Sequence, residues 1–185
     1  MNRRLALGLA GLALATLGGC GFALRQSQSL PFATITLTGF SSSSPLATEL
    51  AQALEDNGVD VVDSTAEAAA AAARRGDPDL VRHAILEAQQ DSREQVVAST
   101  TSFGQVRDLT LRTRLKFRLL RADGSVLMPA TELVLSRDVT FNEKDALAKQ
   151  SEVDALHRAM QTDIVSQAMR RLASVHAAPP PAAAR

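Results

Sequence analysis

The sequence predicts an α/β fold, more narrowly an α+β two-layer sandwich, in which two amphipathic helices pack on one face of a mixed 4–5-stranded sheet. Apolar and polar residues alternate with the period of a strand, most clearly over 109–119. Apolar residues recur with the period of a helix over 156–175. A strand–helix–strand pattern over 33–62 adds parallel pairing to the antiparallel hairpin expected further along.

Residues 1–19 are predicted to be a lipoprotein signal peptide. Arg3 and Arg4 precede an apolar run that is shorter than the roughly 20 residues needed to span a bilayer as a helix. The run ends in Leu17-Gly18-Gly19-Cys20, the bacterial lipobox pattern. A cysteine suits lipidation because its thiolate is a strong nucleophile. We expect covalent S-diacylglycerol and N-acyl lipid on Cys20 and no other cofactor; an ordinary secretory signal with an incidental cysteine is the alternative.

The composition excludes several kinds of site. Cys20 is the only cysteine of the chain, so internal disulfides and thiolate metal sites are excluded. The absence of Trp and Tyr argues against base-stacking platforms and aromatic sugar-binding clefts. Without Arg3 and Arg4 the mature side chains carry a net charge of −2, so the basic footprint of a nucleic-acid-binding protein is absent.

The mature chain divides into three parts. Residues 20–32 are expected to form a lipidated N-terminal tether, and 33–175 a single domain. The Pro/Ala-rich tail over 176–185 is expected to be disordered. Within the domain, 64–78 is an alanine-rich insertion that is expected to be a short helix or a mobile segment, because alanine favours helix but offers little surface to bury.

The first half of the domain predicts a strand–helix–strand unit. Small or apolar residues alternate with threonine over 33–38, which indicates a strand. Ser44-Pro45 suits the N-cap and first position of a helix, and Asn57-Gly58 suits its end. A short strand over 59–62 should then join the same sheet.

Three further strands are predicted. The first runs from about 81 to 100 and is expected to bulge or bend at 89–92. The second is the alternating segment described above, and Asp123-Gly124 after it indicates a hairpin turn. The third passes through 133–141, and Pro129 before it suggests an edge position or a late start.

A long final helix is predicted to run to about Val175. Its start is indicated by Asn142-Glu143-Lys144-Asp145, which resembles a capping sequence. Arg170 and Arg171 suit the negative end of the helix dipole. The predicted buried stripe consists of Leu156, Met160, Ile164, Ala168, Leu172 and Val175.

The face of the sheet away from the helices is expected to be open and basic. Its four cations share one face of one strand, and they are Arg112, Arg114, Lys116 and Arg118. Such a row suits lipid phosphates or the polar wall of a barrel lumen. The alternative is a solvated face on which the cations pair across strands with Glu132 and Asp138.

No catalytic motif or metal-ligand spacing is present in the sequence. His83, His157 and His176 are scattered along the chain. His157 with Asp154 predicts an ordinary contact on a helix surface rather than a metal site. An enzyme that uses carboxylates such as Glu132 and Asp138 is a weaker alternative.

Several of these features occur together in one order. They are Cys20-Gly21-Phe22-x-Leu24-Arg25, the Ile35-Thr36-Leu37 strand, a helix ending before Gly58-Val59, Leu147-Ala148-Lys149-x-x-Glu152, and a last helix ending in Arg170-Arg171-Leu172. The set resembles LptE, the outer-membrane lipopolysaccharide-assembly lipoprotein family. The resemblance implies a non-enzymatic protein that plugs the lumen of the β-barrel LptD in a 1:1 complex, helps it to fold, and takes part in delivering lipopolysaccharide.

The resemblance also implies a lipopolysaccharide-binding site and a location. Lys149 maps onto a binding lysine of the family, and Arg107 is the nearest candidate for a second basic residue, with Glu152 or Asp145 as ordinary ion-pair partners of Lys149. The expected location is the outer membrane, lipid-anchored on the periplasmic side and inside the barrel lumen. The alternative is a generic outer-membrane lipoprotein that binds another periplasmic partner or an anionic envelope polymer.

Overall fold

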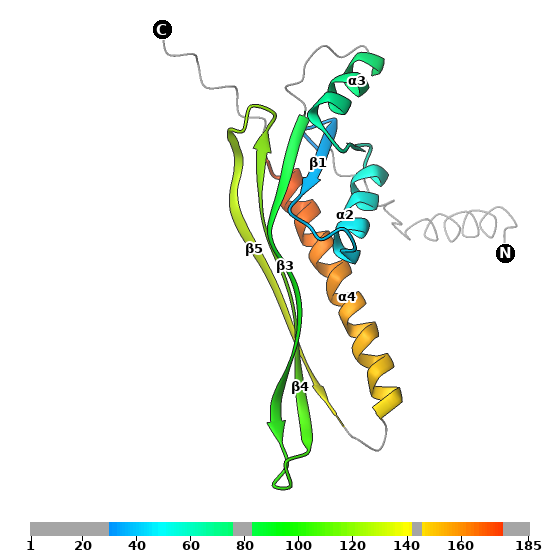
Figure 1. Cartoon of the computed structure of the whole chain (residues 1–185), viewed down its shortest axis with the longest axis vertical. Helices are drawn as coiled ribbons and strands as arrows, with labels where there is room; N and C mark the ends of the chain where they lie inside the picture. The colour runs from blue at the N-terminus through cyan, green and yellow to red at the C-terminus, as the bar shows by residue number, and fades with distance from the viewer. Residues whose placement is uncertain (1–29, 76–82, 142–145, 176–185) are drawn as a thin grey trace, which may run out of the picture.

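A computed structural model of the chain describes residues 30–75, 83–141 and 146–175 (Figure 1). The predictions for the signal peptide, Cys20, most of the tether, the capping sequence at 142–145 and the tail lie outside these residues. The elements in chain order are β1 (Thr34–Thr38), α2 (Pro45–Asp56), β2 (Asp60–Val61), α3 (Thr65–Arg75), β3 (His83–Thr100), β4 (Val106–Arg121), β5 (Val126–Thr140) and α4 (Ala146–Ala173).

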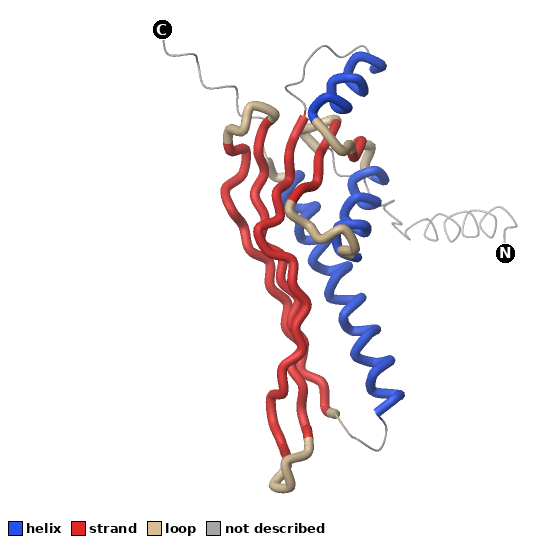
Figure 2. Tube along the Cα trace, in the orientation of Figure 1, coloured by secondary structure: helices blue, strands red, loops and turns tan. Residues whose placement is uncertain are grey.

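The five strands form one mixed sheet in the order β2-β1-β3-β4-β5. Strand β1 is parallel to both of its neighbours, and β3, β4 and β5 form an antiparallel meander. Figure 2 shows the strands as one layer beside α2 and α4. The predicted α+β architecture is therefore confirmed, and β5, which contains Pro129, lies at an edge as its proline suggested.

Helices α2 and α4 cover one face of this sheet. The predicted stripe of α4 is largely confirmed, because Met160, Ile164, Ala168 and Leu172 are buried. The apolar side chains of the sheet meet these helices in a large cluster and in a smaller one formed by Leu111, Val139, Val153 and Met160. The largest side chains that are fully buried on this side are Phe117, Ile35, Leu50, Leu54, Leu86, Leu111, Leu115, Leu119, Met160, Ile164 and Leu172.

The alanine-rich insertion forms helix α3, and this helix lies on the opposite face of the sheet. Val59 and Val61 face the α2–α4 cluster, whereas Asp60 and Val62 line a small pocket with α3. Connections β1–α2–β2 and β2–α3–β3 cross the sheet in opposite directions, so two crossovers of the same hand must place their helices on opposite faces. The open face is consequently covered at its β1–β2 end.

Local signals in the sequence set the ends of α2 as predicted. The Ser44 hydroxyl accepts a hydrogen bond from the Ala47 backbone at 3.1 Å and so caps the helix. The same hydroxyl donates to Asp91 Oδ2 on β3 at 2.5 Å, which ties the start of α2 to the sheet. At the other end Gly58 has φ = 80°, a conformation that costs glycine little.

Strand β3 bulges between Ala88 and Gln90, within one residue of the predicted position. The loop after β1 crosses the strand at this point. An ideal Cβ added to Gly39, which has φ = 80°, would overlap the carbonyl oxygen of Ala88. This close approach of two backbones requires glycine.

The molecule is elongated, and the β3–β4 hairpin projects beyond the other elements (Figure 1). No side chain over 95–107 is buried. Phe103 at the turn is 89% exposed. The hairpin therefore ends as a two-stranded ribbon.

Candidate functional site

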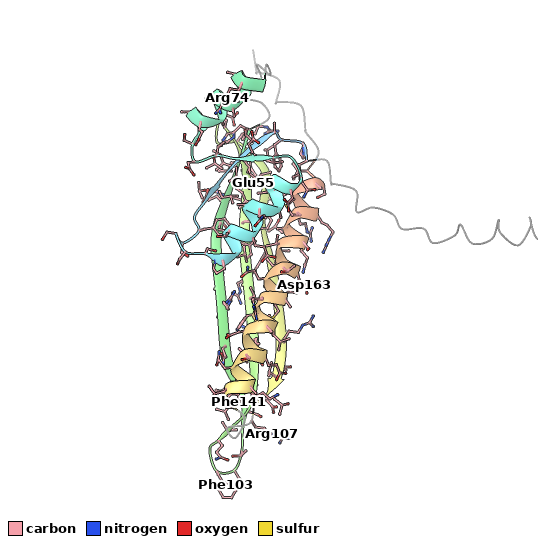
Figure 3. The ribbon with its side chains drawn as sticks, turned by 90° about the vertical axis from the view of Figure 1, so that its right-hand side faces the viewer. Glu55, Arg74, Phe103, Arg107, Phe141 and Asp163 are labelled. Carbon is pink, nitrogen blue, oxygen red and sulfur yellow. The ribbon has the colours of Figure 1, made fainter. Side chains whose placement is uncertain are left out.

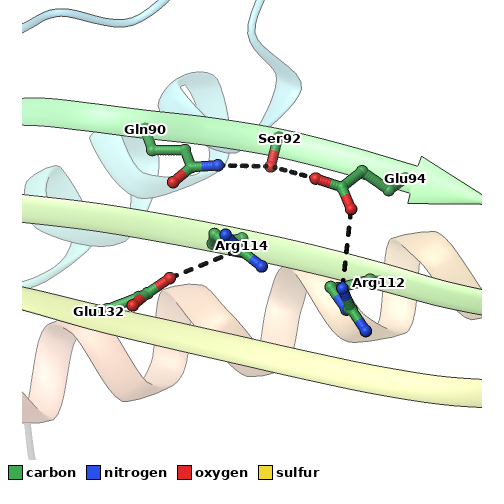
Figure 4. Close-up of polar contacts among 6 residues, drawn as sticks. All are labelled: Gln90, Ser92, Glu94, Arg112, Arg114 and Glu132. Carbon is green, nitrogen blue, oxygen red and sulfur yellow. Dashed lines mark hydrogen bonds and ion pairs between the residues drawn. The ribbon is translucent and has the colours of Figure 1, made fainter.

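The alternation of β4 places the predicted basic row on the face away from α2 and α4. Leu111, Leu115 and Phe117 are fully buried toward the helices. The row, Arg112, Arg114, Lys116 and Arg118, lies half-buried on the opposite side. Figure 4 shows Arg112 and Arg114 of this row. The structure therefore brings the four cations together on one surface, which we call the open face.

The two ends of the row are paired with glutamates of β3. Arg118 donates from Nε and Nη2 to Glu87 Oε2 at 3.0 and 2.7 Å, so this pair is closed and charge-assisted. Arg112 lies directly opposite Glu94 in the register, but Nη1 and Oε2 are 4.0 Å apart. The second pair is therefore a loose contact between groups that are each about 40% exposed.

The middle of the row is less well compensated. Arg114 Nε lies 3.3 Å from Glu132 Oε1 on β5, yet this buried nitrogen has no hydrogen-bond acceptor with suitable geometry. Lys116 lies opposite Glu132 and Gln90 in the register but makes no ion pair with any residue that the structure describes. Glu132 therefore pairs with Arg114 alone, and Lys116 is left without a counter-ion among the described residues.

The predicted pairing with Asp138 is wrong. Asp138 instead accepts a hydrogen bond from the Thr110 hydroxyl at 2.7 Å. Between Glu87 and Glu94, the β3 side of the row carries the uncharged Gln90 and Ser92. Gln90 donates to Ser92 at 3.5 Å and Ser92 donates to Glu94 at 3.4 Å (Figure 4).

Lys149 and Arg107 do not join this row. Lys149 lies in the first turns of α4, on the other side of the sheet, and pairs with Glu152 at 2.7 Å as one sequence interpretation expected. Arg107 lies at the base of the projecting hairpin, 3.8 Å from Asp108, and its side chain is 70% exposed. Figure 3 shows Arg107 and Phe103 at the end of the molecule where α4 begins.

A polar cluster that the sequence analysis missed joins α2, α4 and β3. Arg93 donates to Gln161 Oε1 at 2.8 Å, and Gln161 Nε2 donates to Glu49 Oε2 at 2.6 Å. Thr162 donates to the other oxygen of Glu49 at 2.6 Å. These residues lie on three separate elements, so no local pattern could have linked them.

Two histidines are buried, one on each side of the sheet. His157 lies on the buried side of α4, so its prediction as part of a surface contact is wrong; burial and the nearby Arg93 lower its pKa, while Asp154 opposes the shift. His83 is 2% exposed on the α3 side. Burial lowers the pKa of His83 too, and an interaction with the Thr34 backbone opposes this.

Because both histidines are buried, we expect acid to lower the stability of the fold. In the unfolded chain these histidines take up protons near their ordinary pKa of 6.5. In the folded protein the pKa of each ring is lower, so both rings stay neutral to a lower pH. The free energy of unfolding should therefore fall as the pH drops below about 6.5. Urea titrations between pH 7.5 and 5.5 measure this, and the combined variant His83→Asn, His157→Gln should flatten the dependence; an equally steep dependence in that variant would contradict the assignment.

The described part of the chain offers neither a cluster of metal ligands nor a membrane-spanning helix. The described ranges contain no group of three or more His, Cys, Asp or Glu residues that could hold a metal ion. Among the helices in those ranges, none is long and apolar enough to cross a membrane.

The family model and the curated relatives that match this chain name one family. The family model of LptE, described as lipopolysaccharide-assembly, matches residues 32–172. The LPS-assembly lipoprotein LptE of Yersinia pestis (strain Pestoides F) is 28% identical over 96% of this chain and 80% of its own length. A solution structure of lipoprotein B from Nitrosomonas europaea has a TM-score of 0.65 and 27% identity, covering 83% of this chain and 91% of its own.

A second solved structure supports the fold alone. The rare lipoprotein B from Shewanella oneidensis has a TM-score of 0.58 at 19% identity, covering 76% of this chain and 94% of its own. The family match spans β1 to the last turns of α4, and therefore the whole sheet with its open face. The chain belongs to LptE, the lipopolysaccharide-assembly family.

Proposed function

We propose that this protein occupies the lumen of an LptD-type β-barrel in a 1:1 complex, helps the barrel to assemble, and takes part in delivering lipopolysaccharide to the outer leaflet. The observation that carries the proposal is the family match over 32–172, which gives the chain a role in lipopolysaccharide assembly. The role requires binding and positioning, and no catalytic group.

The length of the sheet supports the proposal. Strand β3 has 18 residues, which span about 60 Å at roughly 3.3 Å per residue. A bilayer with its headgroups is about 40–45 Å thick. A molecule of this length, placed along a barrel axis, extends from one side of the membrane to the other.

The direction of the strands supports one orientation. Thr34 at the start of β1 pairs with His83 at the start of β3, so the described chain begins at the end opposite the hairpin. A lipid on Cys20, ten residues before Leu30, would hold this end at the periplasmic leaflet. The projecting hairpin would then point toward the outer leaflet.

The composition of the hairpin fits that position. Residues 95–106 include no charged side chain, and Val96, Val97 and Phe103 are exposed apolar groups. Arg107 at its base and Lys149 near the start of α4 supply cations at the same end for phosphate groups of lipopolysaccharide.

The test is a pull-down of the tagged, full-length lipoprotein from outer membranes in mild detergent. We expect a stoichiometric large β-barrel that stays bound in high salt, because an extensive lumen interface is not screened as surface ion pairs are. An unrelated outer-membrane lipoprotein with the same tag controls for sharing of detergent micelles. Recovery of the protein without a barrel, together with normal barrel assembly in its absence, would overturn the proposal.

A further inference from the structure

We propose that the middle of the open face is a phosphate-binding subsite, formed by Arg112, Arg114 and Lys116 and separate from the cations at the hairpin end. The inference rests on the proposed function, and it adds a second contact region for a ligand that carries several phosphates. Four features of the open face support the subsite: the charge balance, an unsatisfied donor, the spacing of the cations, and the neutral groups beside them.

The charge balance of the subsite leaves one positive charge over. Glu94 pairs with Arg112 at 4.0 Å and Glu132 pairs with Arg114 at 3.3 Å, whereas Lys116 has no ion pair with a described residue. Arg118 at the end of the row is already neutralised by its closed pair with Glu87. The excess charge therefore lies at Lys116, which is opposite Glu132 in the register but next to the Arg114–Glu132 pair rather than part of it.

The second observation is an unsatisfied donor. Arg114 Nε is buried without a hydrogen-bond acceptor, although a carboxylate oxygen lies within ion-pair distance. A buried charged donor that lacks an acceptor is costly. An external anion with several oxygen atoms could accept this hydrogen bond, because its oxygens are not confined to the direction of Glu132.

The spacing of the cations matches a ligand with more than one phosphate. Neighbouring members of the row are two residues apart on one strand, so they are separated by about 7 Å, and Arg112 and Lys116 by about 13 Å. One phosphate can contact two neighbouring cations. Two phosphates on one molecule can occupy the two ends of the subsite together.

Neutral groups beside the row can complete the contact. Gln90 and Ser92 on β3 make only long hydrogen bonds of 3.5 and 3.4 Å, so their donors can turn to a phosphate oxygen at little cost. Helix α3 covers only the β1–β2 end of this face, and α2 and α4 lie on the other face. None of the described helices therefore covers Arg112, Arg114 and Lys116. The ligand class is therefore a phosphomonoester or phosphodiester that reaches an exposed flat surface.

The test is an equilibrium titration of the full-length protein with fluorescent lipopolysaccharide. Lys116→Gln should weaken binding about 3- to 10-fold because a charge-assisted contact is lost. Glu132→Gln should instead strengthen binding severalfold, because the substitution releases Arg114 from its ion pair and removes the negative charge opposite Lys116. A solvated, non-binding face predicts no change for either variant.

Matched controls separate a local contact from net charge. Arg158→Gln and Glu55→Gln change the net charge by the same amounts on exposed positions of α4 and α2, and both should leave binding unchanged. Thermal melts check that all four variants remain folded. Equal effects of the controls and the open-face variants would overturn the subsite.

Two further arms identify the source of the phosphate. Dephosphorylated lipopolysaccharide should bind all variants equally, and a persisting difference would overturn the inference. Phosphatidylglycerol vesicles should not reproduce the ranking of the variants; if they alone did, the ligand would be a phospholipid surface and the link to lipopolysaccharide would be wrong. Binding that depends on Lys149 but not on Lys116 or Glu132 would refute the subsite and leave the proposed function intact, whereas the pull-down tests that function separately.

Discussion

Replacing Gly39 with alanine is expected to prevent stable folding or to lower the free energy of unfolding by more than about 3 kcal/mol. The new Cβ would overlap the carbonyl of Ala88, and backbone atoms of a paired strand cannot move aside as a flexible side chain can. The positive φ of 80° adds a penalty of about 1–2 kcal/mol for a residue with a Cβ. Urea denaturation followed by circular dichroism measures the loss.

Gly58 provides the matched control for this prediction. It has the same φ of 80°, but a Cβ added there would meet nothing within 4 Å. Gly58→Ala should therefore cost only the conformational penalty of about 1–2 kcal/mol. If the two variants were equally stable, the approach of the β1–α2 loop to the bulge would not matter for folding.

Replacing Phe117 with alanine is expected to lower the free energy of unfolding by about 3–5 kcal/mol and the Tm by roughly 10 °C or more. Phe117 lies on the central strand β4 and is fully buried in the cluster that α2 and α4 cover. The substitution removes most of a large apolar side chain and leaves a cavity that the neighbours cannot fill. Differential scanning calorimetry gives the change in Tm.

Phe103→Ala is the same chemical change in an exposed place. Phe103 is 89% exposed at the hairpin turn, so its loss should change the free energy of unfolding by no more than about 0.5 kcal/mol. A comparable loss in both variants would mean that the hairpin turn is packed in the isolated protein.

The sheet and its two covering helices could be predicted because each depends on a local pattern. The alternation of β4 and the helical stripe ending at Leu172 both match the observed burial. Even the burial of His157 had a signal, since Val153, Met160 and Ile164 lie on the same stripe of α4. The prediction of a surface contact depended on the polar neighbour Asp154, which lies on the exposed side of α4.

The pairing of the basic row could not be predicted in the same way. Alternation assigns Arg112 and Arg114 to one face, but it does not say which carboxylates face them. That depends on the register between β3 and β4, which the bulge after Ala88 shifts. The face covered by α3 likewise depends on strand order. The order sets the direction of the crossover from β2 to β3, and the sequence of the helix does not determine that direction.

The lack of charged residues on the hairpin also affects the tendency of the protein to self-associate. Beyond the residues that pair with β1, β3 is an edge strand, and the β-branched Val96 and Val97 lie on this open edge, which can pair with another copy. Charged residues would discourage such pairing, yet residues 95–106 carry none. Copies of this protein at high concentration are therefore expected to self-associate through the open edge of this hairpin.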